Sequence, residues 1–214
     1  MSEILLDCRK LQCPQPVIQA RGLLQTDRPE RLVMLVDNEP ALENVTRFLS
    51  SQGYATSFEQ KPGLWRITGV AGAPPAAVPD GMGSAGATEP AGAGATARPA
   101  AGEAKTLVMI ISPVFGSGDD DLGGRLMKNF LATLPEMGDS LWRIVMLNGG
   151  VTLAAAGSPV IEELKRLEKA GVSILVCGAC LEHYGLVHEK AVGQTTNMLD
   201  VVTSMQLADK VVRV

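Results

Sequence analysis

Four cysteines are the residues of this sequence best suited to chemistry, and three of them lie in recognisable patterns. Cys13 is followed by Pro14 and Pro16, whereas Cys177 and Cys180 form a Cys-x-x-Cys pair. The thiolate is the nucleophilic form of cysteine, so surroundings that favour the anion indicate sulfur-transfer or redox chemistry. The sequence therefore predicts two thiol sites, separated by more than half of the chain.

The Cys13 site is predicted at the start of a helix. A short apolar strand covers residues 4–6, and an amphipathic stretch follows over residues 17–24. Pro14 suits the first helical position, because proline fixes φ near the helical value and lacks an N–H that would have no partner there. Cys13 would then be the N-cap, facing free backbone N–H groups and the positive end of the helix dipole. This environment predicts a stabilised sulfur anion.

The Cys177/Cys180 pair has three interpretations. Once one thiol is oxidised or carries sulfur, the pair can close a disulfide, or the second thiol can displace the sulfur. His183 is a candidate acid/base group beside the pair. Zinc binding is the third interpretation, because Cys177, Cys180, His183 and His188 supply four potential ligands.

Two further residues each have two interpretations. Cys8 is either a small buried hydrophobic residue or a resolving thiol for Cys13. Asn197 lies in a Thr-Thr-Asn-Met segment and either caps the last helix or reaches the Cys177/Cys180 pair. The sequence leaves both choices open.

Composition divides the chain into two domains and a linker. Residues 71–104 contain thirteen Ala, seven Gly and five Pro among thirty-four positions, with no aromatic residue. A segment with so little apolar surface to bury is expected to be disordered, with an r.m.s. span of roughly 30–35 Å. The predicted divisions are residues 1–70, 71–104 and 105–214.

Charge and hydropathy argue against nucleic-acid binding and against a membrane protein. Residues 1–70 carry eight basic and eight acidic side chains, and residues 105–214 carry ten and twelve. No basic surface for nucleic acid is therefore expected. Apolar runs are too short to span a membrane, and the N-terminus lacks a signal-peptide pattern. The expected location is the cytoplasm, where the cysteines would be mostly reduced.

The elements that must position Cys13 form a small two-layer domain. After the Cys13 helix, the pattern predicts a central strand over residues 31–37 and a helix over residues 39–52. A hairpin of residues 54–59 and 64–68 follows, around a Lys-Pro-Gly turn. The order βαβαββ predicts two helices packed on one face of a sheet.

The elements around the Cys177/Cys180 pair alternate between strands and helices. Strands are expected at residues 105–112, 141–147, 172–177 and 210–214. Helices are expected up to residue 134, over 159–170 with Ser158 as N-cap, and within 182–206. This alternation predicts a mostly parallel α/β sheet, with the cysteine pair at the carboxyl ends of its strands.

The first domain resembles the TusA/SirA-like family of small sulfur carriers. The segment Asp7-x-x-x-Leu11-x-Cys13-Pro14-Gln15-Pro16-Val17 carries the resemblance, which extends over about residues 3–69. It implies that Cys13 accepts sulfane sulfur as a persulfide and passes it to a partner, with Asp7, Pro14 and Pro16 supporting it. Lys10 departs from the pattern, because the family usually has glycine there.

The second domain is similar to the DsrE/DsrF-like sulfur-relay fold. The similarity lies in Leu122-Gly123, in Asn148-Gly149-Gly150-Val151 and in Cys177-Gly178-Ala179-Cys180-Leu181. It implies an active cysteine at Cys177, with Asn148 as a supporting residue and Cys180 as an addition. Relatives of this fold often associate, so a homo-oligomer formed through this domain is a hypothesis, and the sequence leaves the oligomeric state open. The fusion, with its Thr-Asn-Met segment, resembles the YedF family, which is linked to selenium metabolism.

These resemblances imply a sulfurtransferase-like carrier. A donor such as a cysteine desulfurase would load sulfur or selenium on Cys13, and Cys177/Cys180 would relay it to an acceptor protein. The carrier would need no metal and no cofactor other than the persulfide or selenosulfide on cysteine. The alternative is a thiol redox or regulatory module that transfers no sulfur.

Overall fold

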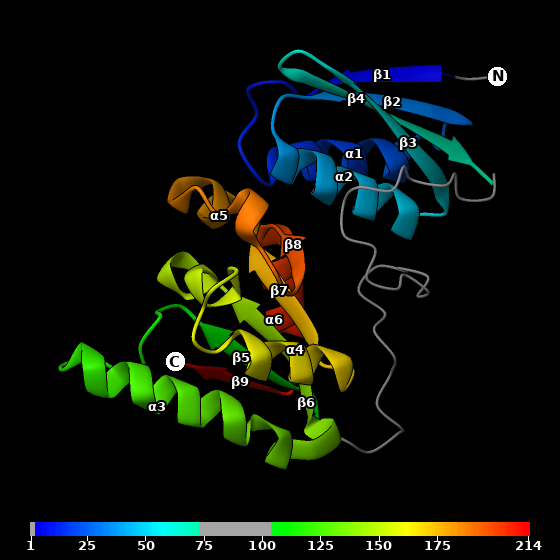
Figure 1. The fold of residues 1–214 in the computed structure, drawn as a ribbon. Coiled ribbons are helices and arrows are strands. Elements are labelled where there is room, and N and C mark those ends of the chain that lie inside the picture. Colours follow the sequence, from blue (N-terminus) through cyan, green and yellow to red (C-terminus); the bar gives the residue numbers. More distant parts are fainter. Residues whose placement is uncertain (1–2, 73–103) are drawn as a thin grey trace. The chain divides into compact units, whose positions relative to one another are not determined.

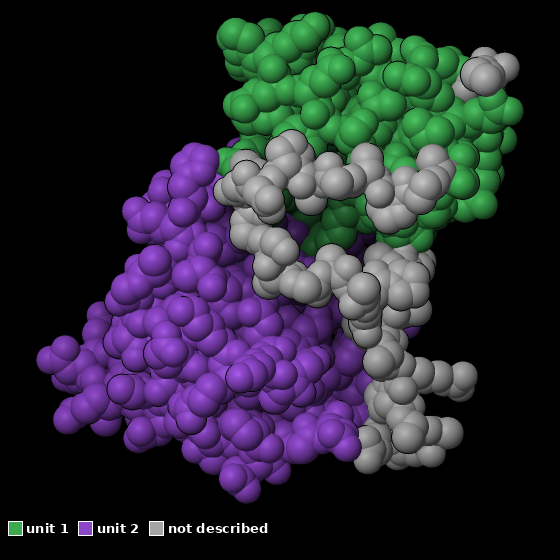
Figure 2. Space-filling model, turned by 45° about the vertical axis from the view of Figure 1, so that its right-hand side comes forward, with its two compact units in different colours: residues 1–96 green, residues 97–214 purple. Residues whose placement is uncertain are grey.

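The chain consists of two compact units, residues 1–96 and residues 97–214 (Figure 2). The computed structural model describes residues 3–72 and 104–214. The predicted linker, residues 71–104, lies outside the described residues except at its ends. Within the described ranges, no helix is long and apolar enough to cross a membrane.

The N-terminal unit has the predicted order βαβαββ. Its elements are β1 (Glu3–Asp7), α1 (Gln15–Thr26), β2 (Arg31–Val36), α2 (Glu39–Ser51), β3 (Tyr54–Lys61) and β4 (Leu64–Ala71). The strand order is β1-β2-β4-β3, with β1 parallel to β2 and the remaining pairs antiparallel. Both helices cover one face of this sheet (Figure 1), so the two-layer prediction is confirmed.

The apolar run in β2 and the amphipathic pattern of α2 supply much of this unit's core. Leu32 and Met34 are fully buried on β2, which lies inside the sheet with a strand on each side. On α2, Val45 and Leu49 are fully buried, as the helical spacing predicts. Asn38 begins α2 by accepting the backbone N–H of residue 41 on its side chain, at 2.8 Å.

The C-terminal unit is built on a fully parallel five-stranded sheet. Its strands are β5 (Thr106–Ile110), β6 (Leu141–Met146), β7 (Ser173–Cys177), β8 (Gln194–Thr196) and β9 (Lys210–Arg213), in the order β8-β7-β6-β5-β9. Its α-helices are α3 (Asp120–Thr133), α4 (Ile161–Lys169), α5 (Gly178–Tyr184) and α6 (Met198–Leu207). The predicted parallel α/β architecture is confirmed.

Helices pack on both faces of this sheet. Alternate strand residues point to opposite faces, and the core divides accordingly. On one face, Ile144 and Ile174 belong to a large cluster with residues of α3, α4 and α5. On the other face, Val145 and Leu175 pack with Val201 of α6. Because α6 joins the edge strands β8 and β9, it must cross this second face.

The structure corrects two predicted elements of the C-terminal unit. The expected helical region over residues 182–206 contains the short strand β8, and its first helix, α5, begins earlier, at Gly178. A strand of three residues is too short to produce a recognisable alternation. Ser158 is not an N-cap, because α4 begins later and its N-cap is Val160, without a side-chain hydrogen bond.

Candidate functional site

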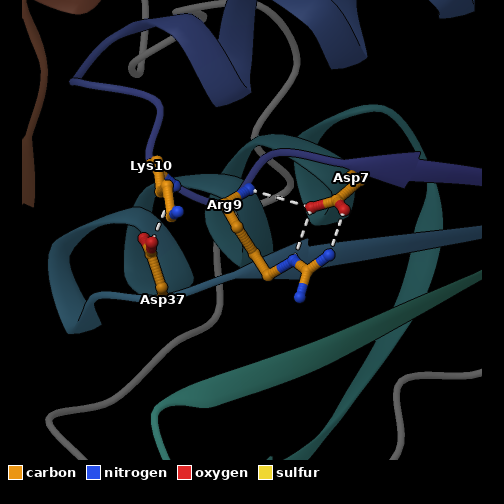
Figure 3. Close-up of polar contacts among 4 residues, drawn as sticks. All are labelled: Asp7, Arg9, Lys10 and Asp37. Carbon is orange, nitrogen blue, oxygen red and sulfur yellow. Dashed lines mark hydrogen bonds and ion pairs between the residues drawn. The ribbon is translucent and has the colours of Figure 1, made fainter.

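Cys13 lies in the loop between β1 and α1, beside the carboxyl ends of two parallel strands. The backbone of this loop is tied to β2 and its following residue. The N–H of Cys8 donates to the carbonyl of Leu35 at 2.9 Å. The N–H of Lys10 donates to the Asp37 carboxylate at 2.7 Å (Figure 3). These bonds hold the first half of the loop at the end of the sheet.

Asp7, predicted as a supporting residue, shapes the start of the same loop through Arg9. Its carboxylate accepts the Arg9 backbone N–H at 3.1 Å and the guanidinium at 2.8 and 2.5 Å (Figure 3). These Arg9 hydrogen bonds lower the pKa of Asp7 to about 2. Both side chains are exposed, so Asp7 contributes to the turn from the solvent side.

Lys10 has a backbone φ of +61°, in the left-handed region that favours glycine. This conformation accounts for the glycine expected there from the family pattern. In this chain the turn forms with lysine instead, and its N–H still reaches Asp37. The departure at Lys10 therefore leaves the loop connection intact.

The helix behind Cys13 begins one residue later than predicted. Pro14 is the N-cap of α1 and Gln15 is its first residue, so Cys13 precedes the cap. The Cys13–Pro14 peptide bond is cis. Cys13 is half-buried. The prediction that Cys13 is itself the N-cap is wrong.

The first amides of α1 also have backbone acceptors. The Gln15 N–H donates to the carbonyl of Gln12 at 2.8 Å, and Pro16 has no N–H to offer. The N–H groups of Val17 and Ile18 both donate to the carbonyl of Pro14, at 3.0 and 3.1 Å. The predicted role of Pro14 and Pro16 is thus altered: Pro14 supplies an acceptor and Pro16 is buried in the first turn. The positive end of the α1 helix dipole still lies beside Cys13.

Cys8 is the small buried residue of this loop. It is 1% exposed, and its thiol donates to the side-chain oxygen of Gln19 at 3.4 Å. Burial, with a smaller contribution from the charge of Asp7, raises the pKa of Cys8 to about 11. The interpretation of Cys8 as a buried hydrophobic residue is the one that this environment favours.

The second pair of cysteines lies at the carboxyl edge of the parallel sheet. Cys177 ends β7 and is the N-cap residue of α5, with 5% of its surface exposed. Cys180 lies one turn into α5, half-buried, and packs against the large core cluster. All four cysteines of the sequence fall within the described residues, and none forms a disulfide.

Asn148 connects the end of β6 to Cys180. Its backbone N–H donates to the sulfur of Cys180 at 3.2 Å, and its φ is +47°. Its side-chain oxygen accepts the hydroxyl of Tyr184 at 3.2 Å. Sequence reasoning missed Tyr184. The available signal was its position four residues after Cys180, because residues four apart share one face of a helix.

Two glycines after Asn148 let this loop approach β5 closely. A Cβ on Gly150 would lie 2.3 Å from the carbonyl oxygen of Ile110. A Cβ on Gly149 would lie 2.9 Å from the ring of Pro113. The backbone contact at position 150 requires glycine. At position 149 the neighbouring atom belongs to the Pro113 side chain, which also leaves little room for a Cβ.

Asn197 has the capping role that was one of its two interpretations. Its side-chain oxygen accepts the N–H groups of Leu199 and Asp200, at 3.0 and 3.2 Å. Its side-chain amide donates to the Asp200 carboxylate at 3.0 Å. The preceding residue, Thr196, pairs with Cys177 in the sheet register. Asn197 therefore caps α6, and it directly follows the β8 residue that pairs with Cys177.

The two histidines lie on the exposed side of this region. His183 is exposed, and its ring meets the Tyr184 ring edge-on, with 5.1 Å between centroids. His188 is also exposed. In the two described ranges, no three Cys, His, Asp or Glu side chains converge as a metal-binding group. The four ligands of the zinc interpretation are thus not gathered around one point.

Comparisons with known proteins cover both units. Residues 4–69 match the family model described as sulfurtransferase TusA, and residues 109–214 match the DsrE/DsrF-like family. No protein of curated function matches the sequence.

Three solved structures are similar to parts of the chain. The ychN protein from E. coli is 16% identical, and the match covers 52% of this chain and 99% of that protein, with a TM-score of 0.43. A SirA-like protein from Desulfitobacterium hafniense is 28% identical over 34% of this chain and 100% of its own, with a TM-score of 0.31. A conserved protein of unknown function from Bacteroides thetaiotaomicron is 15% identical over 51% and 95%, with a TM-score of 0.40.

The fold and the cysteine sites, together with the two family matches, define a two-domain thiol protein related to sulfur carriers and sulfurtransferases. More particularly, the chain is a TusA/SirA-like domain fused to a DsrE/DsrF-like domain. TusA-like proteins in general interact with sulfur donor and sulfur acceptor proteins.

Proposed function

We propose that this chain is an intramolecular relay for sulfane sulfur or selenium; selenium is included because the fusion resembles the YedF family, which is linked to selenium metabolism. Cys13 takes the atom from a donor, and the Cys177/Cys180 pair receives it from Cys13. The observation that carries the proposal is the presence of two half-buried cysteines, Cys13 and Cys180, in two different domains of one chain. Each lies at the carboxyl ends of parallel strands.

Loading requires a thiolate at Cys13 that the donor can reach. The Cys13 thiolate attacks the outer sulfur of a donor persulfide, such as that of a cysteine desulfurase, and the donor leaves as a thiolate. Half-burial and the position before α1 support this role, because the positive end of a helix favours an anion. The buried Cys8, with a pKa raised to about 11, is poorly suited to it.

Transfer between the domains is the second step. Both thiol sites belong to one polypeptide, so the encounter between them is intramolecular and has an effective concentration set by the linker. Thiol–persulfide exchange is thereby favoured over loss to free thiols in solution. The proposed linker of residues 71–104 supports such an encounter by its Ala/Gly/Pro composition.

Mass spectrometry of the loaded chain tests the proposal. The full chain is incubated with a cysteine desulfurase and cysteine, and its peptides are then mapped under non-reducing conditions. An adduct of one sulfur atom is expected on the Cys13 peptide. Cys13→Ser is expected to abolish sulfur uptake, whereas Cys8→Ser, the matched control in the same loop, is expected to retain it.

Two outcomes would overturn the proposal. One is uptake that Cys13→Ser does not change. The other is reversible oxidation of Cys177/Cys180 with no transferable sulfur anywhere on the chain, which identifies a redox or regulatory module. Parallel loading with labelled sulfur and labelled selenium distinguishes the two elements, because the adduct masses differ.

A further inference from the structure

The two cysteines of the C-terminal pair differ in how easily another molecule can reach them. Cys177 is 5% exposed and belongs to the large core cluster, at the end of β7. Cys180 is half-buried, and the preceding Ala179 is exposed. A persulfide carried by another domain has to approach its nucleophile from solvent, so the difference in burial favours Cys180 as the first point of attack.

A backbone amide is directed at the sulfur of Cys180. The N–H of Asn148 donates to this sulfur at 3.2 Å. An N–H group holds a sulfur anion more strongly than a neutral thiol, because hydrogen bonds to charged acceptors are stronger. The hydrogen bond therefore orients the Cys180 side chain and fixes the position of its sulfur.

The amide is held in place from two sides. The hydroxyl of Tyr184 donates to the side-chain oxygen of Asn148 at 3.2 Å, and Tyr184 belongs to the same helix as Cys180. On the other side, the N–H of Leu147 donates to the carbonyl of Ile110 at 2.9 Å. The close approach of Gly150 to the same carbonyl leaves this loop little room to shift. Asn148 thus has a fixed position relative to α5.

We infer that Cys180 is the sulfur-accepting nucleophile of the pair, that Cys177 is the resolving thiol, and that Asn148 and Tyr184 are positioning residues for Cys180. This assignment rests on the proposed relay function. It differs from the family resemblance, which places the active cysteine at Cys177 and treats Cys180 as an addition.

The two steps balance without any metal or cofactor. The Cys180 thiolate attacks the outer sulfur of the Cys13 persulfide; the bond between that sulfur and Cys13 breaks, and Cys13 leaves as a thiolate. Cys180 then carries the –SH group as a persulfide. The Cys177 thiolate next attacks the Cys180 sulfur, forming the Cys177–Cys180 disulfide and releasing hydrosulfide. The sulfane atom is reduced and the two cysteines are oxidised, so a dithiol reductant must then restore the pair.

Sulfur trapping in single variants tests the order of the two thiols. Glutathione persulfide is used as the donor to the full chain. In Cys177→Ser, a persulfide is expected to accumulate on Cys180 with no release of hydrosulfide. In Cys180→Ser, sulfur is expected to remain on Cys13 and Cys177 is expected to stay unmodified. Sulfur trapped on Cys177 in the Cys180→Ser variant would overturn the assignment.

Direct alkylation separates failure of this assignment from failure of the relay. Iodoacetamide is applied to the reduced chain without any sulfur donor, and Cys180 is expected to react at least tenfold faster than Cys177, because Cys177 is the more buried of the two. If Cys13 takes up no sulfur but Cys180 still reacts first, the relay fails and the order of reactivity stands. Faster reaction of Cys177 overturns the assignment whether or not Cys13 loads.

The positioning role is tested by paired variants. Tyr184→Phe removes the hydroxyl, and Asn148→Gly keeps the backbone N–H and suits a positive φ but removes the side-chain acceptor. Each is expected to slow Cys180 alkylation by about threefold to tenfold, and the double variant is expected to be no slower than either single one. Additive losses would contradict the shared hydrogen bond.

Two controls make the result specific to the Cys180 region. Tyr54→Phe removes the only other tyrosine hydroxyl in the sequence, which donates to Pro29 at 2.8 Å in the N-terminal unit. It is expected to leave the Cys180 rate unchanged. In NMR spectra, the Asn148 amide resonance is expected to shift when Cys180 is alkylated. A resonance that stays in place would overturn the amide–sulfur contact.

Discussion

The loops that carry the two thiol sites are held by different kinds of interaction. Each contains one of the two non-glycine residues with positive φ among the described residues: Lys10 in the N-terminal unit and Asn148 in the C-terminal unit. The Lys10 loop has one backbone hydrogen bond to β2, from Cys8 to Leu35, and is otherwise held by the carboxylates of Asp7 and Asp37. The Asn148 loop is fixed by backbone hydrogen bonds and by close packing at Gly150.

This difference has consequences for the chemistry of each site. Carboxylates that hold a loop from solvent make it sensitive to acid and to substitution of single polar groups, but tolerant of changes in side-chain size. A loop held by backbone contact is insensitive to acid but cannot accept an added methyl group. On this comparison, the N-terminal loop tolerates changes in side-chain size better than the C-terminal loop does.

Among the variants that test this comparison, Gly150→Ala should cause the largest loss of stability. The new Cβ would lie 2.3 Å from the Ile110 carbonyl oxygen, and overpacking against backbone is expected to lower the free energy of unfolding of the C-terminal unit by about 3 kcal/mol. Urea unfolding measures the change. Gly124→Ala on α3 is the control, because a Cβ added there would meet no atom of a neighbouring element within 4 Å. It should raise the free energy of unfolding by about 0.5–1 kcal/mol.

Cysteine reactivity within the N-terminal loop is the second test. Because the pKa of Cys8 is raised to about 11 from an ordinary 9.0, its thiolate fraction at pH 8 should be about a hundredfold below that of an ordinary cysteine. Time-resolved alkylation followed by peptide mapping should therefore label Cys13 well before Cys8. Labelling of both at equal rates in the folded chain would show that the loop opens readily.

Lys10→Gly should stabilise the N-terminal unit modestly. Glycine removes the cost of the +61° φ, partly offset by the greater entropy of the unfolded chain, so the free energy of unfolding should rise by about 0.5–1 kcal/mol. Lys10→Ala, which keeps the unfavourable φ, should give no such gain. Thermal unfolding distinguishes the two variants, and equal stability would mean that the turn relaxes around lysine without cost.

Acid titration should give the smallest effect and, of these two loops, should act on the Lys10 loop, which is the one held by carboxylates. The folded pKa of Asp7, about 2, lies below its ordinary 3.8. Its contribution to stability is therefore fully present above about pH 4 and is lost as the pH falls toward 2. NMR titration of the Asp7 carboxyl should give a midpoint near 2. In Arg9→Gln, which removes the guanidinium, the midpoint should return toward 3.8.

Much of the fold followed from local sequence patterns. The nearly continuous apolar run of β2 predicted a buried central strand, because such a run has no polar side to expose. The helical spacing of α2 predicted its buried face. The strand β8 was missed, since three residues carry no period, and the beginning of α1 was placed one residue early, since Pro14 can occupy either the first helical position or the cap.

The sequence by itself determined the residue types on which the chemistry depends: the Cys13-Pro-x-Pro element, the Cys177/Cys180 pair and the Asn-Gly-Gly loop. Only the tertiary structure decided how the cysteines differ, because burial and hydrogen bonding arise between segments distant in sequence. The sulfur of Cys180 accepts the N–H of Asn148, which lies 32 positions earlier in the sequence. Cys177 belongs to the buried core beside its sheet. Spacing along the chain contains no information about which of two neighbouring thiols faces solvent.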